Sequence, residues 1–223
     1  MPLIRKGAEA NLYLEDFRDV LHPAGEGKVL VKHRIPKRYR VGELDERLRD
    51  SRTVLEARLL SDAKRAGVPT PAIYEVDREE TRLVMEFVEG ERVKSVLEEM
   101  NSSERRKLCE LIGRQIARLH LAGIIHGDLT TSNMIRTRDG RVYFIDFGLG
   151  EYSSSVEARG VDLHLLKRTL RSTHHRVAEE SFEAVVAGYE REFGRKAKEV
   201  IRRVEEIERR GRYIAREERS RMR

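Results

Sequence analysis

The chain has 223 residues, a formal net charge of +6 and a sequence pI near 9.5. Charged residues make up 38% of it, against roughly 25% in typical soluble domains, and it lacks an apolar run near the roughly 20 residues that a membrane span needs. The N-terminus has no apolar secretory core and Cys109 is the single cysteine, so we expect a cytoplasmic protein without intrachain disulfides or membrane segments.

The N-terminal part of the chain predicts a sheet with one long helix. Apolar residues at helical spacing predict a helix over 42–65, which must end before Gly67 and Pro69. The segments that read as strands are 28–34, 72–77, 81–88 and 3–17, the last as two strands around a turn at 6–10. We expect these strands to form a small antiparallel sheet.

Residues 89–90 break the last strand and are expected to link this sheet to a mainly helical second lobe. The Asp139-Gly140 turn predicts a hairpin between two short strands. The segments with helical periodicity are 93–100, 104–122, 161–170, 181–193 and 196 to about 210. The expected fold class is therefore α+β, with an N-terminal lobe over 1–89, a C-terminal lobe over 90–210 and a basic tail over 211–223.

The segment HGDLTTSN, residues 126–133, followed by FIDFG at 144–148, carries the groups of a phosphoryl-transfer site. Asp128 would lie near the attacking oxygen as base or water positioner, while Asn133 and Asp146 would hold Mg²⁺ that bridges nucleotide phosphates. Either HGD or DFG alone is a common turn tripeptide. In this order, with Asn133 between them and a strand leading into Asp146, they predict a site for ATP and Mg²⁺.

A lysine and a carboxylate from the N-terminal lobe complete the expected site. Lys32 lies on an alternating strand that would point its amine into the cleft, towards the α- and β-phosphates. Glu56 is the expected partner that orients Lys32, because the leucines around it would pack its helix face on the sheet. Glu46 is the alternative partner.

The first turn is expected to cover the phosphates with its backbone amides. It consists of Gly7, Ala8, Glu9 and Ala10, with Asn11 beside them. Because it has a single glycine, its position rather than its composition carries this expectation. A carboxylate beside phosphates is repulsive, so Glu9 would face Mg²⁺, a partner or solvent, and the sequence leaves these alternatives open.

The end of the strand before the linker is expected to line the adenine pocket. Its residues are Met85, Glu86, Phe87 and Val88, whose backbone offers the donor and the acceptor that an adenine edge requires. Met85 would be the gatekeeper of this pocket. A core methionine on an interior strand explains Met85 as well, and the two roles are compatible.

With these residues assembled, the chain resembles the protein-kinase superfamily and, more narrowly, the KEOPS-complex kinase/ATPases, which are PRPK-type atypical kinases, here of archaeal type. The resemblance covers essentially the whole chain and rests on KGAEA in place of a glycine-rich loop, VKHRIPKRYR around Lys32, LDERLRDSRTVLEARLL around Glu56, HGDLTTSNM, FIDFGL and the arginine-rich end. It implies a compact bilobal protein-kinase-like fold with ATP and Mg²⁺ as cofactors. It also implies ATP hydrolysis or Ser/Thr phosphorylation, including of the chain itself, in support of threonylcarbamoyl-adenosine formation on tRNA.

The resemblance further implies partners. A Kae/TsaD-type tRNA-modifying ATPase would bind the C-terminal lobe, a small KEOPS subunit the N-terminal lobe, and tRNA the basic tail. From the residues alone, the arginine density of the tail predicts contact with nucleic acid or an acidic protein, or equally a solvated helix end.

The segment after the DFG glycine departs from ordinary protein kinases. About a dozen residues separate Gly148 from Val161, without an APE motif, which favours water or an autophosphorylated side chain over a broad peptide substrate as acceptor. Asp162 would bond back to the expected catalytic loop at 126–133 or simply lie near a helix N-terminus. Two functional alternatives stay open at this point: a RIO-like or small-molecule kinase, and a nucleotide-binding scaffold without turnover.

Overall fold

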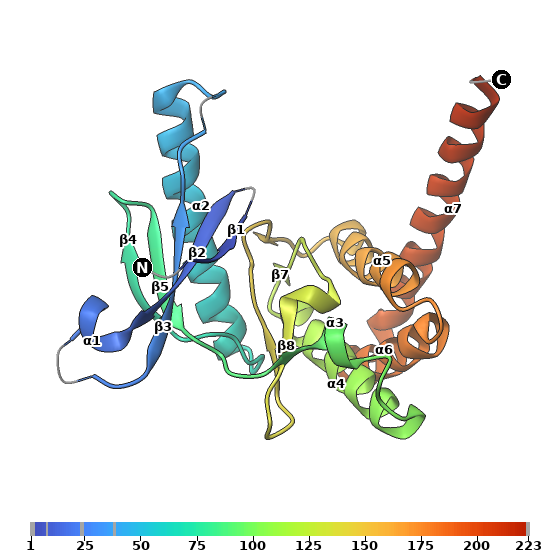
Figure 1. Cartoon of the computed structure of the whole chain (residues 1–223). Helices are drawn as coiled ribbons and strands as arrows, with labels where there is room; N and C mark the ends of the chain where they lie inside the picture. Colours follow the sequence, from blue (N-terminus) through green and yellow to red (C-terminus); the bar gives the residue numbers. More distant parts are fainter. Residues whose placement is uncertain (1–2, 8, 23–24, 38, 222–223) are drawn as a thin grey trace.

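The computed structural model describes residues 3–7, 9–22, 25–37 and 39–221, and of 211–221 the backbone alone. A β-sheet with one long helix forms the N-terminal lobe, and helices form most of the C-terminal lobe (Figure 1). A linker after the sheet joins the two lobes (Figure 1). The last helix of the chain projects away from the C-terminal lobe (Figure 1). The expected bilobal α+β architecture is confirmed. In the part of the chain that the structure describes, no helix is long and apolar enough to cross a membrane.

The sheet of the N-terminal lobe has β3 at its centre. Its strands are β1 (Leu3–Lys6), β2 (Ala10–Asp16), β3 (Lys28–Arg34), β4 (Ile73–Asp77) and β5 (Arg82–Glu86), antiparallel in the order β1-β2-β3-β5-β4. Val29 and Val31 lie on one face against α1 (Phe17–Val20), a short helix that the sequence did not reveal. Because side chains alternate along a strand, Lys32 and Arg34 lie on the opposite face.

The long helix α2 (Gly42–Arg65) carries a buried stripe. Buried residues recur every three or four positions, which is the period of a helix, and include Thr53, Glu56 and Leu60. Glu56 therefore faces the interior, whereas Glu46, one of the two candidate partners of Lys32, is exposed.

The C-terminal lobe consists of helices with short strands between them. Its elements are β6 (Glu91–Arg92), α3 (Val93–Val96), α4 (Ser102–Leu121), β7 (Ile124–Ile125), η1 (Thr131–Asn133), β8 (Met134–Arg136), β9 (Val142–Phe144), β10 (Glu151–Tyr152), α5 (Val156–Thr173), α6 (Ala178–Phe193), η2 (Gly194–Lys196) and α7 (Ala197–Arg221). The predicted hairpin is confirmed as β8 and β9, with β6 on its free edge. Phe144, Phe147 and Tyr189 are among the largest fully buried side chains of the core.

Several element boundaries differ from the expected ones. Helix α3 ends at Val96, because the chain continues in turns rather than in a regular helix. Helix α5 begins earlier than expected because Ser155 caps it, accepting the N–H of Ala158 at 3.0 Å. Strand β10, which pairs with β7, is too short to show alternation in the sequence. Helix α7 runs to Arg221 rather than to about residue 210, so the described part of the basic tail is helical.

Ion pairs hold the first half of α7 on α5. Glu208 accepts hydrogen bonds from Lys167 at 2.8 Å and Arg171 at 2.5 Å, and Arg203 lies 3.2 Å from Glu157. The hydrogen bond from Lys167, together with that from Arg171, lowers the pKa of Glu208 to about 2. The carboxylate therefore stays ionised at neutral pH and holds the direction of α7 relative to the lobe.

Gly113→Ala is expected to lower the free energy of unfolding by about 1–3 kcal/mol, the usual cost of overpacking. Helices α4 and α6 pack so closely that a Cβ at Gly113 would overlap the carbonyl oxygen of Val185, and one at Gly188 would overlap that of Glu110. Gly42→Ala is the matched control, because a Cβ there meets open space. Urea unfolding of the two variants measures the difference, and equal stabilities would contradict the close packing.

Candidate active site

Lys32 joins the two lobes through a pair of carboxylates. Its Nζ lies 2.6 Å from Oε1 of Glu56 and 2.7 Å from Oδ1 of Asp146, and the residue is 8% exposed. Burial alone would lower the pKa of Lys32, but the charges of Glu56 and Asp146 outweigh it and raise the pKa above its ordinary value. The structure thus selects Glu56 over Glu46 as the partner and keeps the amine charged.

The catalytic-loop residues Asp128 and Asn133 are bonded to each other. The side-chain amide nitrogen of Asn133 donates to Oδ2 of Asp128 at 2.7 Å and to its carbonyl oxygen at 3.0 Å. Because an amide has separate donor and acceptor ends, this leaves the Asn133 side-chain oxygen for a cation. The 3-10 turn η1 presents Asn133 one turn after Asp128, as the motif spacing predicts.

Asp162 holds the catalytic loop by its backbone. Its carboxylate accepts the N–H of His126 at 2.9 Å and of Gly127 at 3.0 Å, and the residue is 1% exposed. It lies inside α5 rather than at its first turn, so the bond to the loop accounts for it. Burial alone would raise the pKa of Asp162, but the hydrogen bond and charge of His120 hold it below its ordinary value, and Asp162 is ionised.

The Asp146 carboxylate and the Asn133 side-chain oxygen are suitable ligands for Mg²⁺. Asp146 has φ = 65°, a left-handed conformation that is uncommon outside glycine. Burial alone would raise the pKa of Asp146, but Lys32 keeps it below its ordinary value, so the carboxylate is charged. Among the described residues, His, Cys, Asp and Glu nowhere gather in threes as a metal cage. A carboxylate and an amide oxygen that leave the other positions to phosphates and water are the ligand set that Mg²⁺ usually has beside a nucleotide.

Two hollows meet at Lys32, Asn133 and Asp146. One, of about 270 Å³, is mainly apolar, with Leu30 and Met85 in its wall. The other, of about 370 Å³, lies under the first turn and has charged and amide side chains in its wall, so we call it the polar hollow. Its walls are Gly7, Glu9, Ala10, Leu12, Lys32, Arg34, Asp128, Asn133, Asp146, Gly148 and Leu149. An apolar hollow that continues into a hollow lined by charged side chains can hold a nucleotide base followed by its phosphates.

Most of the residues expected around the nucleotide line these hollows. Met85, Glu86, Phe87 and Val88 line the apolar one, and Met85 also belongs to the core, so both of its expected roles fit. Asn11 is not brought to either wall, because strand alternation turns it away from Ala10 and Leu12. Its side-chain nitrogen donates instead to the Tyr13 hydroxyl at 3.1 Å. Ala8 lies outside the described residues.

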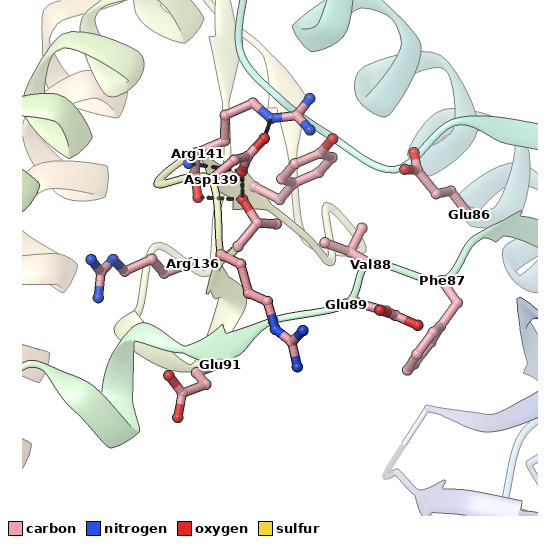
Figure 2. Close-up of a pocket in the computed structure, with 12 residues that line it drawn as sticks. Glu86, Phe87, Val88, Glu89, Glu91, Arg136, Asp139 and Arg141 are labelled. Atoms are coloured by element: carbon pink, nitrogen blue, oxygen red, sulfur yellow. Dashed lines mark hydrogen bonds and ion pairs between the residues drawn. The ribbon is translucent and has the colours of Figure 1, made fainter.

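A third hollow, of about 830 Å³, lies at the linker and was not predicted. It shares Glu86, Phe87 and Val88 with the apolar hollow. Figure 2 shows that Phe87 and Val88 point to different sides of the linker. Its wall carries charges of both signs, which are Glu86, Glu89, Glu91, Arg136, Arg138, Asp139 and Arg141. A hydrogen bond of 2.6 Å from Arg141 to Asp139 fixes the hairpin turn at its edge (Figure 2).

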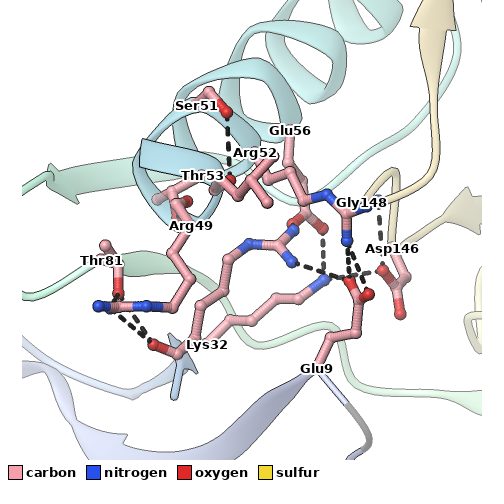
Figure 3. Close-up of polar contacts among 12 residues, drawn as sticks. Glu9, Lys32, Arg49, Ser51, Arg52, Thr53, Glu56, Thr81, Asp146 and Gly148 are labelled. Carbon is pink, nitrogen blue, oxygen red and sulfur yellow. Dashed lines mark hydrogen bonds and ion pairs between the residues drawn. The ribbon is translucent and has the colours of Figure 1, made fainter. Parts of the chain in front are cut away.

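Sequence reasoning missed two arginines beside the polar hollow. Arg34 is buried and donates to Oε2 of Glu56 at 2.6 Å. Arg52, on α2, donates to both carboxylate oxygens of Glu9 at 2.6 Å (Figure 3). The position of Arg34 two residues after Lys32, on the same strand face, was the available signal. Glu9 faces these arginines, which was not among the alternatives considered for it.

Known proteins resemble the chain in sequence along most of its length. The RIO domain family matches residues 38–168. The KEOPS complex subunit Bud32 of Pyrococcus abyssi is 52% identical over 216 residues, which cover 96% of both chains. A probable serine/threonine-protein kinase BUD32 homolog of Archaeoglobus fulgidus is 47% identical over 188 residues, covering 84% of this chain and 90% of that one.

One further relative and one solved structure belong to chains longer than this one. A probable bifunctional tRNA threonylcarbamoyladenosine biosynthesis protein of Methanosarcina acetivorans is 46% identical over 210 residues, which are 93% of this chain and 35% of that protein. A solved structure of the Rio2 kinase-ADP/Mg²⁺-phosphoaspartate complex from Chaetomium thermophilum superimposes with a TM-score of 0.61 at 16% identity, covering 91% of this chain and 69% of that one. That likeness confirms the kinase-like fold. Since the RIO domain matches more than half of the chain and a relative is 52% identical along nearly all of it, the chain belongs to the RIO-domain kinases and, among them, to the Bud32 family.

Proposed function

We propose that this chain is the Mg²⁺- and ATP-dependent kinase/ATPase subunit of a KEOPS complex and supports threonylcarbamoyl-adenosine modification of tRNA. The observation that carries the enzymatic part is the bridge from Lys32 to Glu56 and Asp146, which connects the two lobes at the junction of the two hollows. The names of the Pyrococcus and Methanosarcina relatives support the complex and the tRNA modification.

The residues of the site act by positioning and by charge. Lys32 binds the α- and β-phosphates, and Glu56 keeps its amine in place. Asn133 and Asp146 hold Mg²⁺, which when bound neutralises the charge that develops on the transferred phosphoryl group. Asp128 orients the attacking hydroxyl or water and accepts its proton, since its hydrogen bond from Asn133 fixes one carboxylate oxygen and leaves the other available.

Water or a Ser/Thr side chain of the chain itself is the proposed phosphoryl acceptor. Helix α5 begins at Val156, only a few residues after Gly148, and β10 pairs with β7 in between. The segment that docks peptides in larger kinases therefore has little length here. The stretch 153–155, in which Ser154 and Ser155 are exposed, supplies hydroxyl groups a few residues after Gly148, in a chain whose A. fulgidus relative is named a serine/threonine-protein kinase.

The proposed partners bind different parts of the chain. A Kae/TsaD-type ATPase contacts the lobe formed by 90–210, where Tyr152 and Val161 are exposed apolar residues. A small KEOPS subunit contacts the lobe formed by 1–89, where Tyr39 is 77% exposed. The tRNA contacts the basic tail at the end of α7.

ATP binding and turnover by the purified chain test the proposed function. We expect Mg²⁺-dependent turnover, measured alone and with a Kae/TsaD-type ATPase and tRNA from the same organism. Nucleotide binding without turnover in both conditions would favour the scaffold alternative. Release of inorganic phosphate identifies an ATPase, whereas label retained on Ser or Thr of the chain identifies a RIO-like kinase.

A further inference from the structure

Arg34 occupies the wall of the polar hollow beside Lys32. Both side chains leave the same face of β3, and Arg34 is 3% exposed. Glu56 connects them, because its Oε1 accepts from Lys32 and its Oε2 from Arg34, each at 2.6 Å. A Cβ at Gly148 would lie 3.1 Å from Nη2 of Arg34 and 3.5 Å from Nζ of Lys32. The glycine therefore leaves room for two fixed cations at the point where phosphates would enter.

Glu9 places an anion at this point. Its Oε2 lies 3.5 Å from Nη1 of Arg34, and both of its oxygens accept from Nη1 of Arg52 at 2.6 Å (Figure 3). Burial alone would raise the pKa of Glu9, but Arg52 and Arg34 lower it, so the side chain is ionised at neutral pH. Glu9 lies on the turn between β1 and β2 and its side chain is 42% exposed, whereas that of Arg34 is 4% exposed.

Ion pairs beside the polar hollow form one network whose charges balance without a nucleotide, while Asp128, which also lines the hollow, lies outside that network. The members of this ion network are the cations Lys32, Arg34 and Arg52 and the anions Glu9, Glu56 and Asp146. The contact between Glu9 and Arg34, at 3.5 Å, is the longest in the network, whose other contacts are 2.6 or 2.7 Å. An entering phosphate would add negative charge beside Glu9. Because Coulomb attraction weakens with distance, the contact between Glu9 and Arg34 costs the least free energy to break.

We propose that Arg34 is a second phosphate-binding cation next to Lys32, and that the Glu9 carboxylate stands in for a nucleotide phosphate at Arg34 when no nucleotide is bound. The inference rests on the proposed function as an ATP-binding enzyme. A phosphate of the nucleotide displaces the Glu9 carboxylate from Arg34, while Glu9 stays bound to Arg52. Since Arg52 already binds both oxygens of Glu9, this carboxylate is an internal competitor of the phosphates rather than a ligand of Mg²⁺.

Glu9→Gln tests the competition directly. The variant is expected to bind ATP and ADP about threefold to tenfold more tightly than the wild type. In the wild type, the partly exposed ion pair between Glu9 and Arg34 must break before phosphate binds, and in the variant this cost is absent. Its affinity for adenosine, which has no phosphate, should not change. Isothermal titration calorimetry of the full chain with each ligand gives these affinities without relying on turnover. Glu46→Gln, which removes an exposed carboxylate from the same lobe, is the matched control and should match the wild type for all three ligands.

Arg34→Gln tests the phosphate contact. ATP and ADP should bind about tenfold or more weakly, while adenosine binds as to the wild type, because a charge-assisted contact to phosphate is lost. Adding Glu9→Gln to Arg34→Gln should bring no further change, since Glu9 competes with phosphate for Arg34 and that cation is already lost. Arg34→Lys keeps the charge next to Glu56 and should lose less affinity, and it replaces Arg34→Gln if that variant has no cooperative thermal unfolding.

The outcomes separate this inference from the proposed function. A wild-type chain that does not bind ATP would contradict the proposed function itself. If the wild type binds ATP, the inference is overturned when Glu9→Gln binds ATP no more tightly than the wild type. It is also overturned when Glu9→Gln binds adenosine more tightly to the same degree, or when Arg34 variants keep the full affinity for ATP.

Discussion

Asp146→Asn is expected to reduce ATP turnover by about 10²-fold or more, as when a charge-stabilising group leaves an active site. Asparagine has nearly the same shape and tolerates the left-handed backbone that this position adopts, with φ = 65°. The variant should therefore fold, but it offers Mg²⁺ a neutral oxygen and offers Lys32 no counter-charge at 2.7 Å. Turnover measured over a range of Mg²⁺ concentrations should show a higher Mg²⁺ requirement as well as a lower maximum.

Asp139→Asn is the matched control for this experiment. Asp139 is an exposed carboxylate of the hairpin between β8 and β9, bonded to Arg141 and outside the polar hollow. It should keep wild-type turnover at every Mg²⁺ concentration. Wild-type turnover in Asp146→Asn would remove Asp146 from the proposed metal site.

Lys32→Met should lower turnover by about 10²-fold, because methionine keeps an apolar chain of similar length but removes the amine that binds phosphates. The variant should remain folded, since Glu56 keeps its hydrogen bond from Arg34 at 2.6 Å. Losing the other partner is expected to lower the free energy of unfolding by about 1–3 kcal/mol. Single-turnover kinetics with calorimetric ATP binding separate a loss of affinity from a loss of rate.

Lys94→Met controls for the removal of a lysine. Lys94 is exposed on α3, away from the two hollows that meet at Lys32. Turnover and stability of this variant should match those of the wild type. If Lys32→Met and Lys94→Met behaved alike, the bridge between the lobes would have no role in turnover.

The parts of the site that the sequence predicted are those fixed by local spacing. Asp128 and Asn133 lie five residues apart in one loop, so their contact depends on a short turn alone. Glu56 could be preferred over Glu46 because helical periodicity indicates which face of a helix is buried. Asp146 lies two residues after the buried strand β9, and its position relative to the loop is set by the hairpin of β8 and β9.

The parts that were missed depend on contacts between distant segments or on weak local signals. Glu9 and Arg52 are 43 positions apart, and nothing in either local sequence indicates that they meet. The start of α5 was placed too late because Ser155 caps a helix whose first residues are not regularly apolar. The end of α7 was placed too early because arginine and glutamate, both good helix formers, surround Gly211, which reads as a helix end.

Helix α7 determines how a partner bound at the tail would be presented to the active site. It is one continuous helix from Ala197 to Arg221 (Figure 1), about 37 Å long at 1.5 Å per residue. Glu208, near the middle of the helix, holds it on α5. A flexible tail of the same length would let a bound molecule sample a large volume, which dilutes it relative to the catalytic lobe. The helical spacer instead fixes distance and direction, so that a molecule held at its tip has a high effective concentration at one place beside the protein and a low one everywhere else.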